Sequence, residues 1–229
     1  MAVFKGFPQD TLPFLGELKA NNNKAWFNEN KPRYEALVRE PALAFIESMS
    51  DGLTEISPHF RAIAKKVGGS LMRVYRDTRF ANDKTPYKTN IGIQFRHELG
   101  KDVHAPGFYL HIEPDGCFIG AGIWHPESKT LGQIRSFMDD NPAAWNKAVK
   151  AAAFAKQFTL EGESLKRPPR GFTVDHPLID DLKRKDFIAI KSIDAEAIHS
   201  PRFTQSVLKD FRRTDAFMRY LCTAINVNY

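Results

Sequence analysis

The sequence predicts an α+β fold, in which a central antiparallel sheet of four to five strands lies between helical ends. Apolar residues recur at helical spacing through the first sixty residues, and again after residue 126. Between these parts, apolar and polar residues alternate with the period of a strand that has one buried side. We expect one domain over residues 1–229, helical over 1–66, strand-rich over 67–125 and helix-rich over 126–229.

Three helices are predicted in the N-terminal part. The first begins after Asp10, a residue type that suits a helix N-cap, and ends at the asparagine cluster 21–23. The second contains the apolar stripe of residues 26–38, and the third spans residues 43–53. With 6 basic and 8 acidic side chains, the first sixty residues are slightly acidic.

An antiparallel meander of about four strands is predicted next. The alternation marks strands at residues 71–76, 91–97, 108–113 and 117–124. Pro114-Asp115-Gly116 has the composition of a tight turn between the last two. Within the strand at 108–113, the alternation places Tyr109, His111 and Glu113 on one face. That face is opposite to the apolar one, which we expect to be buried.

The C-terminal half is predicted to be mainly helical. Helices begin at residues 126–127 and 140–142, and residues 162–171 form a basic extended connector. Residues 187–190 are a short apolar run that we expect to be a fifth strand. The spacing of apolar residues over 203–225 predicts one long amphipathic C-terminal helix.

Composition and missing motifs exclude several classes of protein. The apolar runs fall far short of the roughly 18 residues of a membrane span, and the N-terminus lacks the pattern of a secretory signal. Cys117 and Cys222 are far apart in a chain without an export signal, which argues against a disulfide. P-loop, dinucleotide-binding and nucleophile-elbow motifs are absent, so no particular cofactor is indicated. We expect a cytoplasmic protein without a membrane partner.

Positive charge is concentrated in one part of the chain. The net charge is +6, and residues 61–101 carry 10 basic side chains against 3 acidic ones. Half of these cations belong to residues 73–88, which we call the basic loop. Guanidinium and ammonium groups gathered in this way favour binding of phosphate or carboxylate. The candidate ligand-binding residues are Arg73, Tyr75, Arg76, Arg79, Lys84, Tyr87 and Lys88.

Two interpretations of the basic loop are open. In the first, its cations converge on an anionic ligand, and Tyr75 or Tyr87 packs against the ligand's ring or base. In the second, Asp77 and Asp83 pair with Arg79 and Lys84, and the loop is a structural plug at the sheet edge. Two carboxylates cannot neutralise five cations, so the loop keeps a positive surplus in either case.

His111 and Glu113 are the candidate catalytic residues. Both titrate in a range useful for general acid and base catalysis, and His97 or His125 would join them if neighbouring strands are in register. Two alternatives are open. The two residues could be metal ligands that need a third ligand from elsewhere, or they could belong to a solvated polar face of the sheet. No residue is assigned as a metal ligand.

Six stretches of the chain form a pattern that runs nearly from end to end. They are FKGFP (4–8), NNKAWF (22–27) with the following Asn30, Lys31 and Tyr34, RVYRDTRFANDKTPYK (73–88), YLHIE (109–113), GIWHP (122–126) and KRPPRGF (166–172). Together they resemble the DUF2461 family. This family is uncharacterised, so the resemblance implies one α+β domain and no assigned chemistry.

Three hypotheses about function follow. The first is binding of a phosphate-bearing or other anionic small molecule by the basic loop, with catalysis left open. The second is nucleic-acid binding, since the isoelectric point is near 9.3 and the cations are interleaved with Tyr75, Phe80 and Tyr87. The third is an interaction module in which the loop is purely structural.

Overall fold

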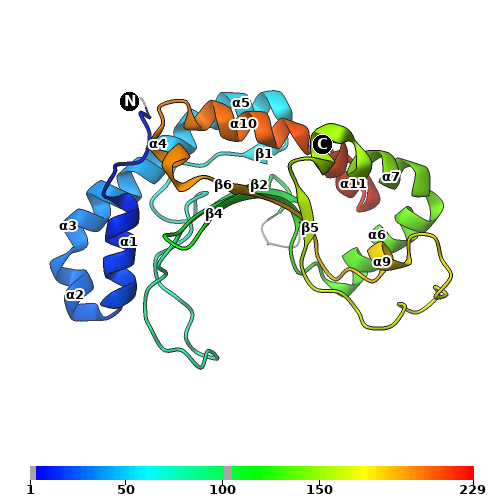
Figure 1. Cartoon of the computed structure of the whole chain (residues 1–229), viewed down its shortest axis with the longest axis horizontal. Coiled ribbons are helices and arrows are strands. Elements are labelled where there is room, and N and C mark those ends of the chain that lie inside the picture. The colour runs from blue at the N-terminus through cyan, green and yellow to red at the C-terminus, as the bar shows by residue number, and fades with distance from the viewer. Residues whose placement is uncertain (1–3, 101–104) are drawn as a thin grey trace.

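The chain forms an arch, with a curved sheet at its centre and helices above it and at both sides (Figure 1). The computed structural model describes residues 4–100 and 105–229. The sheet has six strands, all neighbours are antiparallel, and the spatial order is β1-β2-β3-β4-β6-β5. The strands are β1 (Phe60–Arg61), β2 (Ile91–His97), β3 (Gly107–Ile112), β4 (Cys117–Ile123), β5 (Thr159–Glu161) and β6 (Phe187–Ile193).

The predicted α+β class is confirmed, with one strand more than the four to five expected. None of the described helices is long and apolar enough to cross a membrane. The helices are α1 (Thr11–Ala20), α2 (Lys24–Glu29), α3 (Lys31–Tyr34), the π-helix η1 (Glu35–Arg39), α4 (Glu40–Ser48), α5 (Ser50–Ile56), α6 (Ser128–Asp140), α7 (Pro142–Lys150), α8 (Ala152–Ala155), α9 (Ile179–Leu182), the 3-10 helix η2 (Ala195–His199), α10 (Phe203–Arg213) and α11 (Asp215–Ala224).

One face of the sheet is packed against helices. Figure 1 shows α4, α5 and α10 above the sheet, and α11 continues this layer. The ring of Phe211 on α10 stacks on Phe108 of β3 with centroids 4.5 Å apart, and it also contacts Phe95 of β2. All three rings are fully buried. Each such side chain stabilises the fold by about 1.5–3 kcal/mol relative to an exposed one, so this layer fixes which face stays open.

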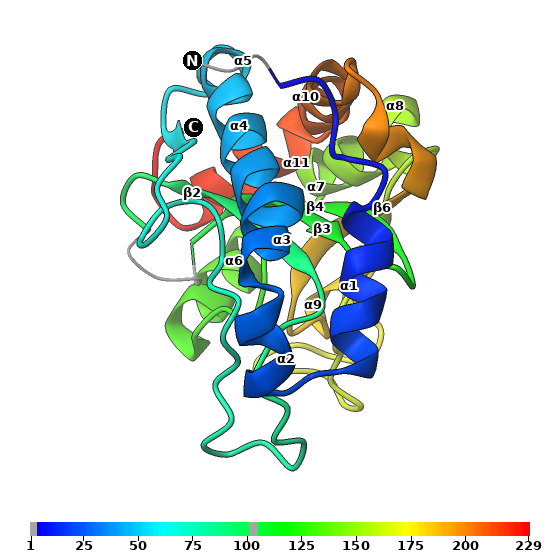
Figure 2. The same cartoon turned by 90° about the vertical axis from the view of Figure 1, so that its left-hand side faces the viewer.

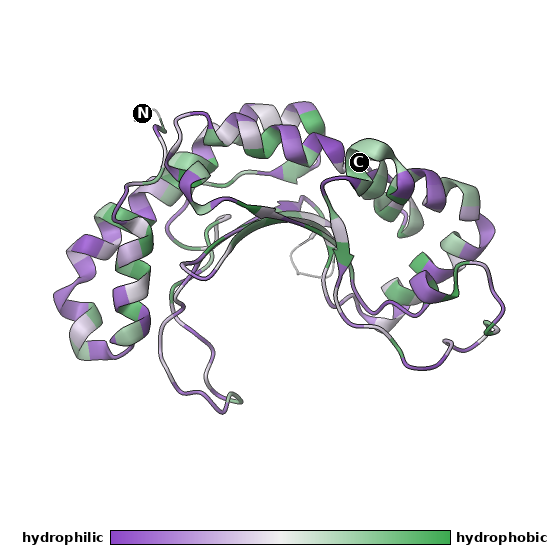
Figure 3. Cartoon of the chain, in the orientation of Figure 1, coloured by the Kyte–Doolittle hydropathy of each residue, from purple (hydrophilic) through white to green (hydrophobic). Residues whose placement is uncertain are grey.

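The other face of the sheet is not covered by a helix (Figure 1). Gln94, Tyr109, His111, Phe118 and Ile190 point to this side, and each is only partly buried. Two long loops, one of them the basic loop, extend on the same side and consist mostly of hydrophilic residues (Figure 3). We call this surface the open face.

The N-terminal helices form the arm beside the basic loop. Figure 2 shows α1 and α2 next to α3 and the long segment that leads into α4, with the basic loop descending beside α2. The ring of Phe27 in α2 packs on Tyr34 with centroids 5.2 Å apart, and Asn23 caps α2 by accepting a hydrogen bond from the Trp26 N–H. The arm therefore holds the end of α1 next to the basic loop.

The strand expected at residues 71–76 is not formed. Only isolated bridges occur there, from Leu71 to Ile93 and from Tyr75 to Tyr87. The segment changes its partner midway, since the Met72 N–H donates to a β2 carbonyl whereas the Arg76 N–H donates to the returning half of the loop. A β-strand needs a continuous row of backbone hydrogen bonds to one neighbouring strand, and residues 71–76 lack such a neighbour.

In the C-terminal half, one further expectation was wrong and one strand was missed. The helix expected over 203–225 is divided into α10 and α11, because the N–H and hydroxyl of Thr214 both donate to the Phe211 carbonyl and close the first helix. Strand β5 was not foreseen, as its three residues are too short to show a period. The predicted strand at 187–190 is confirmed within β6.

Candidate functional site: a cationic cavity beside the basic loop

A cavity of about 400 Å³ lies between the end of α1 and the basic loop. Its size is within the range of small-molecule sites. The residues that line it carry three cations and one carboxylate, so its walls have a net positive charge. They are Lys19, Asn22, Arg76, Asp83, Thr85, Tyr87, Lys88, Thr89 and Asn90.

The wall of the cavity is fixed by Asn22 and Tyr87. The Asn22 side-chain amide donates to the Tyr87 carbonyl at 2.9 Å, and its oxygen accepts from the Tyr87 N–H at 3.0 Å. The buried Tyr87 ring stacks on Phe27 with centroids 4.0 Å apart and ring planes 20° from parallel. Tyr75 contacts the Tyr87 ring from the basic loop and is 54% exposed. Tyr87 thus anchors the loop to the N-terminal arm.

Arg76 is a cation of the cavity that already has an acidic partner. Its guanidinium donates to the Asp83 carboxylate and to the Thr85 hydroxyl. Asp83 also accepts from the Thr85 N–H at 2.9 Å. These hydrogen bonds, first that of the Thr85 N–H and then that of Arg76, lower the pKa of Asp83 to about 2. Arg76 therefore lines the cavity with its charge partly neutralised.

Lys88 is the cation of the cavity without such a partner. Its side chain is half-buried, and among the described residues no carboxylate pairs with its ammonium group. Burial lowers the pKa of Lys88, and the nearby Arg73 lowers it further. Both causes disfavour the charged form of Lys88. An anion close to the ammonium group would therefore reduce the free-energy penalty of keeping Lys88 charged in this position.

The remaining candidates of the basic loop lie outside the cavity wall. Arg79 pairs with Asp77 at 2.7 Å and is 76% exposed, and Lys84 donates to the Thr78 carbonyl at 2.9 Å. Arg73 and Tyr75 are exposed as well. The pairing of Asp77 with Arg79 agrees with the structural interpretation of the loop, whereas Asp83 pairs with Arg76 in place of Lys84.

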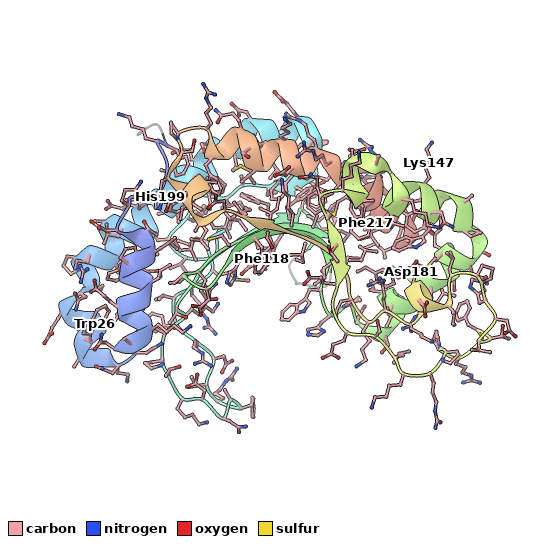
Figure 4. All side chains as sticks on the ribbon, in the orientation of Figure 1. Trp26, Phe118, Lys147, Asp181, His199 and Phe217 are labelled. Atoms are coloured by element: carbon pink, nitrogen blue, oxygen red, sulfur yellow. The ribbon has the colours of Figure 1, made fainter. Side chains whose placement is uncertain are left out.

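Tyr109, His111 and Glu113 form a hydrogen-bonded relay on the open face. His111 Nε2 lies 3.1 Å from Glu113 Oε2, and His111 Nδ1 lies 3.0 Å from Tyr109 Oη. An ionised carboxylate only accepts hydrogen bonds, so Nε2 carries the proton and Nδ1 accepts from the phenol. The imidazole ring stacks on Phe118 with centroids 4.6 Å apart, and Figure 4 shows Phe118 below the sheet.

The relay and the cavity are joined by two residues of the cavity wall. Thr89 donates to Glu113 Oε1 at 3.1 Å, and the Asn90 amide lies 3.4 Å from His111 Nδ1. Burial and the charge of Glu113 raise the pKa of Tyr109 to about 12, so this phenol stays protonated and donates. The structure therefore brings the two sequence-predicted constellations, the basic loop and the His111 strand, next to each other.

The family model that matches the chain is that of DUF2461, described as a conserved hypothetical protein, and the match covers residues 10–220. The chain belongs to this family. The resemblance noted in the sequence is thereby confirmed. No curated protein and no solved structure matched the chain in the corresponding comparisons.

In this DUF2461 protein neither His97 nor His125 approaches the relay, contrary to the alternative considered above. His97 lies on the buried face of the sheet and bonds the Asn228 carbonyl at 2.9 Å, and the register puts Gly92 opposite His111. His125 follows the far end of β4, with Nδ1 3.2 Å from Asp186. Within the described ranges no group of three or more His, Cys, Asp or Glu side chains could hold a metal ion.

Lys19, Asn22, Thr89 and Asn90 are site residues that the sequence did not reveal. Lys19 forms an exposed pair with Asp115, and the other three fix the wall or contact the relay. The only signal in the sequence was the asparagine cluster 21–23, which was interpreted as a helix end. Nothing in the spacing indicated that α1 would meet the basic loop.

Proposed function

We propose that this DUF2461 protein binds a small phosphate-bearing or other anionic molecule in the cavity beside the basic loop. The observation that carries the proposal is Lys88, a half-buried ammonium group without a carboxylate partner among the described residues. Phosphate oxygens beside this group would form charge-assisted hydrogen bonds. Phosphate esters of the cytoplasm are the first candidates, since the sequence predicts that compartment.

The cavity offers further groups that suit an anion. Arg76 can share its guanidinium between Asp83 and a ligand, because a guanidinium has five N–H donors. Asn90 and Thr89 add a neutral amide and a hydroxyl at the side nearest to the relay. Asp83 is the only carboxylate among the lining residues, and its low pKa keeps it ionised, which favours a ligand that does not contact it.

The relay gives the site a means of moving a proton. If a ligand that extends from the cavity to Tyr109 gives a proton to the phenol oxygen, the phenol can pass its own proton to His111 Nδ1, and Glu113 stabilises the imidazolium that results. We therefore propose His111 and Glu113 as the acid–base pair of this site, joined to the cavity through Thr89 and Asn90 of its wall.

A thermal-shift screen tests the proposal. Inorganic phosphate, sugar phosphates and nucleotides are added to the wild type and to the Lys88→Met variant. Lys84→Met is the matched control, because it removes the same charge from the same loop outside the cavity wall. We expect at least one phosphate compound to raise the Tm of the wild type and of the control but not of Lys88→Met. The proposal would be overturned if the phosphate compounds stabilised all three proteins equally, or if none of these compounds stabilised the wild type.

A further inference from the structure

The open face of the sheet lies between two basic loops. Figure 1 shows the basic loop on one side and the loop between β5 and α9 on the other, both extending away from the helical layer. We call residues 162–178 the second basic loop. Its segment 164–174 contains Lys166, Arg167 and Arg170 and no acidic residue.

The cations of the second basic loop are available to a ligand. Lys166, Arg167 and Arg170 are all exposed, and no carboxylate in the described ranges pairs with them. On the opposite side, Arg73 is likewise exposed and has no carboxylate within pairing distance among the described residues. Positive charge therefore remains uncompensated on both sides of the open face, which is the arrangement that attracts an extended polyanion.

Exposed aromatic rings accompany these cations. Phe80 in the basic loop is 94% exposed, and the Arg79 guanidinium lies 5.8 Å from its ring centroid. Trp124, which directly follows β4, is 56% exposed and packs on the His125 ring at 4.3 Å. Phe118 adds a partly exposed ring within the sheet. Exposed aromatic rings next to cations are the groups on which bases of a single strand stack.

We infer that the open face and its two flanking loops bind single-stranded nucleic acid. Cations on both loops would contact backbone phosphates, and bases would stack on Phe80, Trp124 and Phe118. An acidic polypeptide would pair its carboxylates with the cations, but it has no bases that could stack on the aromatic rings. A duplex hides its bases within the stack, so a single strand fits these rings better. This inference goes beyond the small-anion cavity, because the second basic loop contributes no residue to that cavity.

Fluorescence anisotropy with a labelled oligothymidylate of about 20 nucleotides tests the inference. The test variant is K166A/R167A/R170A. The control K147A/K150A/K156A removes the same charge from three exposed lysines of α7 and the end of α8, and Figure 4 shows Lys147 on the side away from the open face. We expect the test variant to bind about tenfold more weakly or worse, and the salt slope of its log affinity to fall by roughly 2. The control should bind like the wild type.

The Phe80→Ala variant tests stacking separately. Its affinity for the oligothymidylate should be lower than that of the wild type by a factor of roughly five or more. The salt dependence of the affinity should not change, because the substitution removes a ring and no charge. A chain of polyglutamate of similar length is the competitor without bases. Three results would each overturn the inference. Polyglutamate could bind as tightly as the oligonucleotide, or the two triple variants could have equal affinities. The third is that the wild type fails to bind the oligonucleotide at low salt.

The same measurements distinguish this inference from the small-anion site. Lys88→Met should lose the thermal response to phosphate esters and keep most of its oligonucleotide affinity, whereas K166A/R167A/R170A should show the opposite pattern. Oligonucleotide affinity that depends on Lys88 and not on the second basic loop would overturn the inference and leave the cavity as the site.

Discussion

The side-chain amide of Asn22 pairs with both backbone groups of Tyr87, 65 positions later in the chain. It occupies the place that a neighbouring strand would take, and it satisfies an N–H and a carbonyl that the irregular loop would otherwise leave unpaired. Because Asn22 follows α1 and Tyr87 belongs to the basic loop, this contact joins the two walls of the cavity. The geometry of the proposed anion site therefore depends on a residue that has no charge.

Replacing Asn22 by Ala should destabilise the protein by about 1–3 kcal/mol, because both backbone groups of Tyr87 lose their partner. Chemical denaturation measures this loss. The control is Asn21→Ala, which removes one exposed hydrogen bond to the Glu17 carbonyl and should cost within about 0.5 kcal/mol. Similar losses in both variants would contradict the anchoring role of Asn22.

Asp83→Asn should bind phosphate several-fold more tightly than the wild type. The amide keeps an oxygen for the Thr85 N–H, so the turn is retained, but the guanidinium of Arg76 loses its charged competitor. Asp77→Asn is the matched control, since Asp77 pairs with the exposed Arg79 away from the cavity wall. Titration calorimetry compares the two. Unchanged affinity in Asp83→Asn would show that Arg76 does not contact the anion.

Asp77 and Asp83 should both remain ionised in moderately acidic solution. Their hydrogen bonds lower each pKa from 3.8 to about 2. A carboxylate with a depressed pKa stabilises the fold above its ordinary pKa, and this contribution is lost as the pH falls through the lowered value. Carboxyl NMR titration should therefore give two aspartate midpoints near 2. Midpoints near 3.8 would show that the loop pairs are not formed in solution.

The tyrosine titration tests the relay. Burial and the charge of Glu113 raise the pKa of Tyr109 to about 12, so Glu113→Gln should lower this pKa by removing the charge. Ultraviolet titration of the wild type, the variant and a Tyr109→Phe protein identifies the signal. The wild-type His111 should show the tautomer protonated on Nε2 in nitrogen NMR. The other tautomer would contradict the proton path from Tyr109 to Glu113.

Lys88 should make stability depend on pH in the alkaline range. Its pKa in the fold is lower than the ordinary 10.5, so the unfolded chain binds more protons between the two values and stability rises with pH. In buffer without phosphate, the wild type should be less stable than Lys88→Met near neutral pH. This difference should shrink as the pH rises through the lowered pKa. A constant difference would contradict the uncompensated charge.

The strands that follow one alternating pattern could be predicted from the sequence. Strands β2, β3 and β4 have apolar residues at every second position, so both their existence and the face of His111 followed directly. Residues 71–76 show the same alternation, yet they pair with two different partners and form no continuous strand. Alternation reveals the faces of a segment, but it contains no information about its neighbours.

The candidate site was predictable only in part, for the same reason. Charge density identified the basic loop, and the structure places Arg76, Tyr87 and Lys88 at the cavity while Arg79 and Lys84 bond within the loop. Local sequence could not show which cations would meet α1. Contacts such as Asn22 with Tyr87 arise when the N-terminal arm packs against the sheet, and these depend on the whole fold.

The dissociation constant of inorganic phosphate for the wild type, Lys88→Met and Lys84→Met, measured by titration calorimetry at neutral pH, tests the central claim most directly. A charge-assisted hydrogen bond contributes about 1.5–3 kcal/mol. We therefore predict that Lys88→Met binds phosphate at least about tenfold more weakly than the wild type and that Lys84→Met binds it equally well. Equal dissociation constants for all three proteins would contradict the claim that the cavity at Lys88 binds anions.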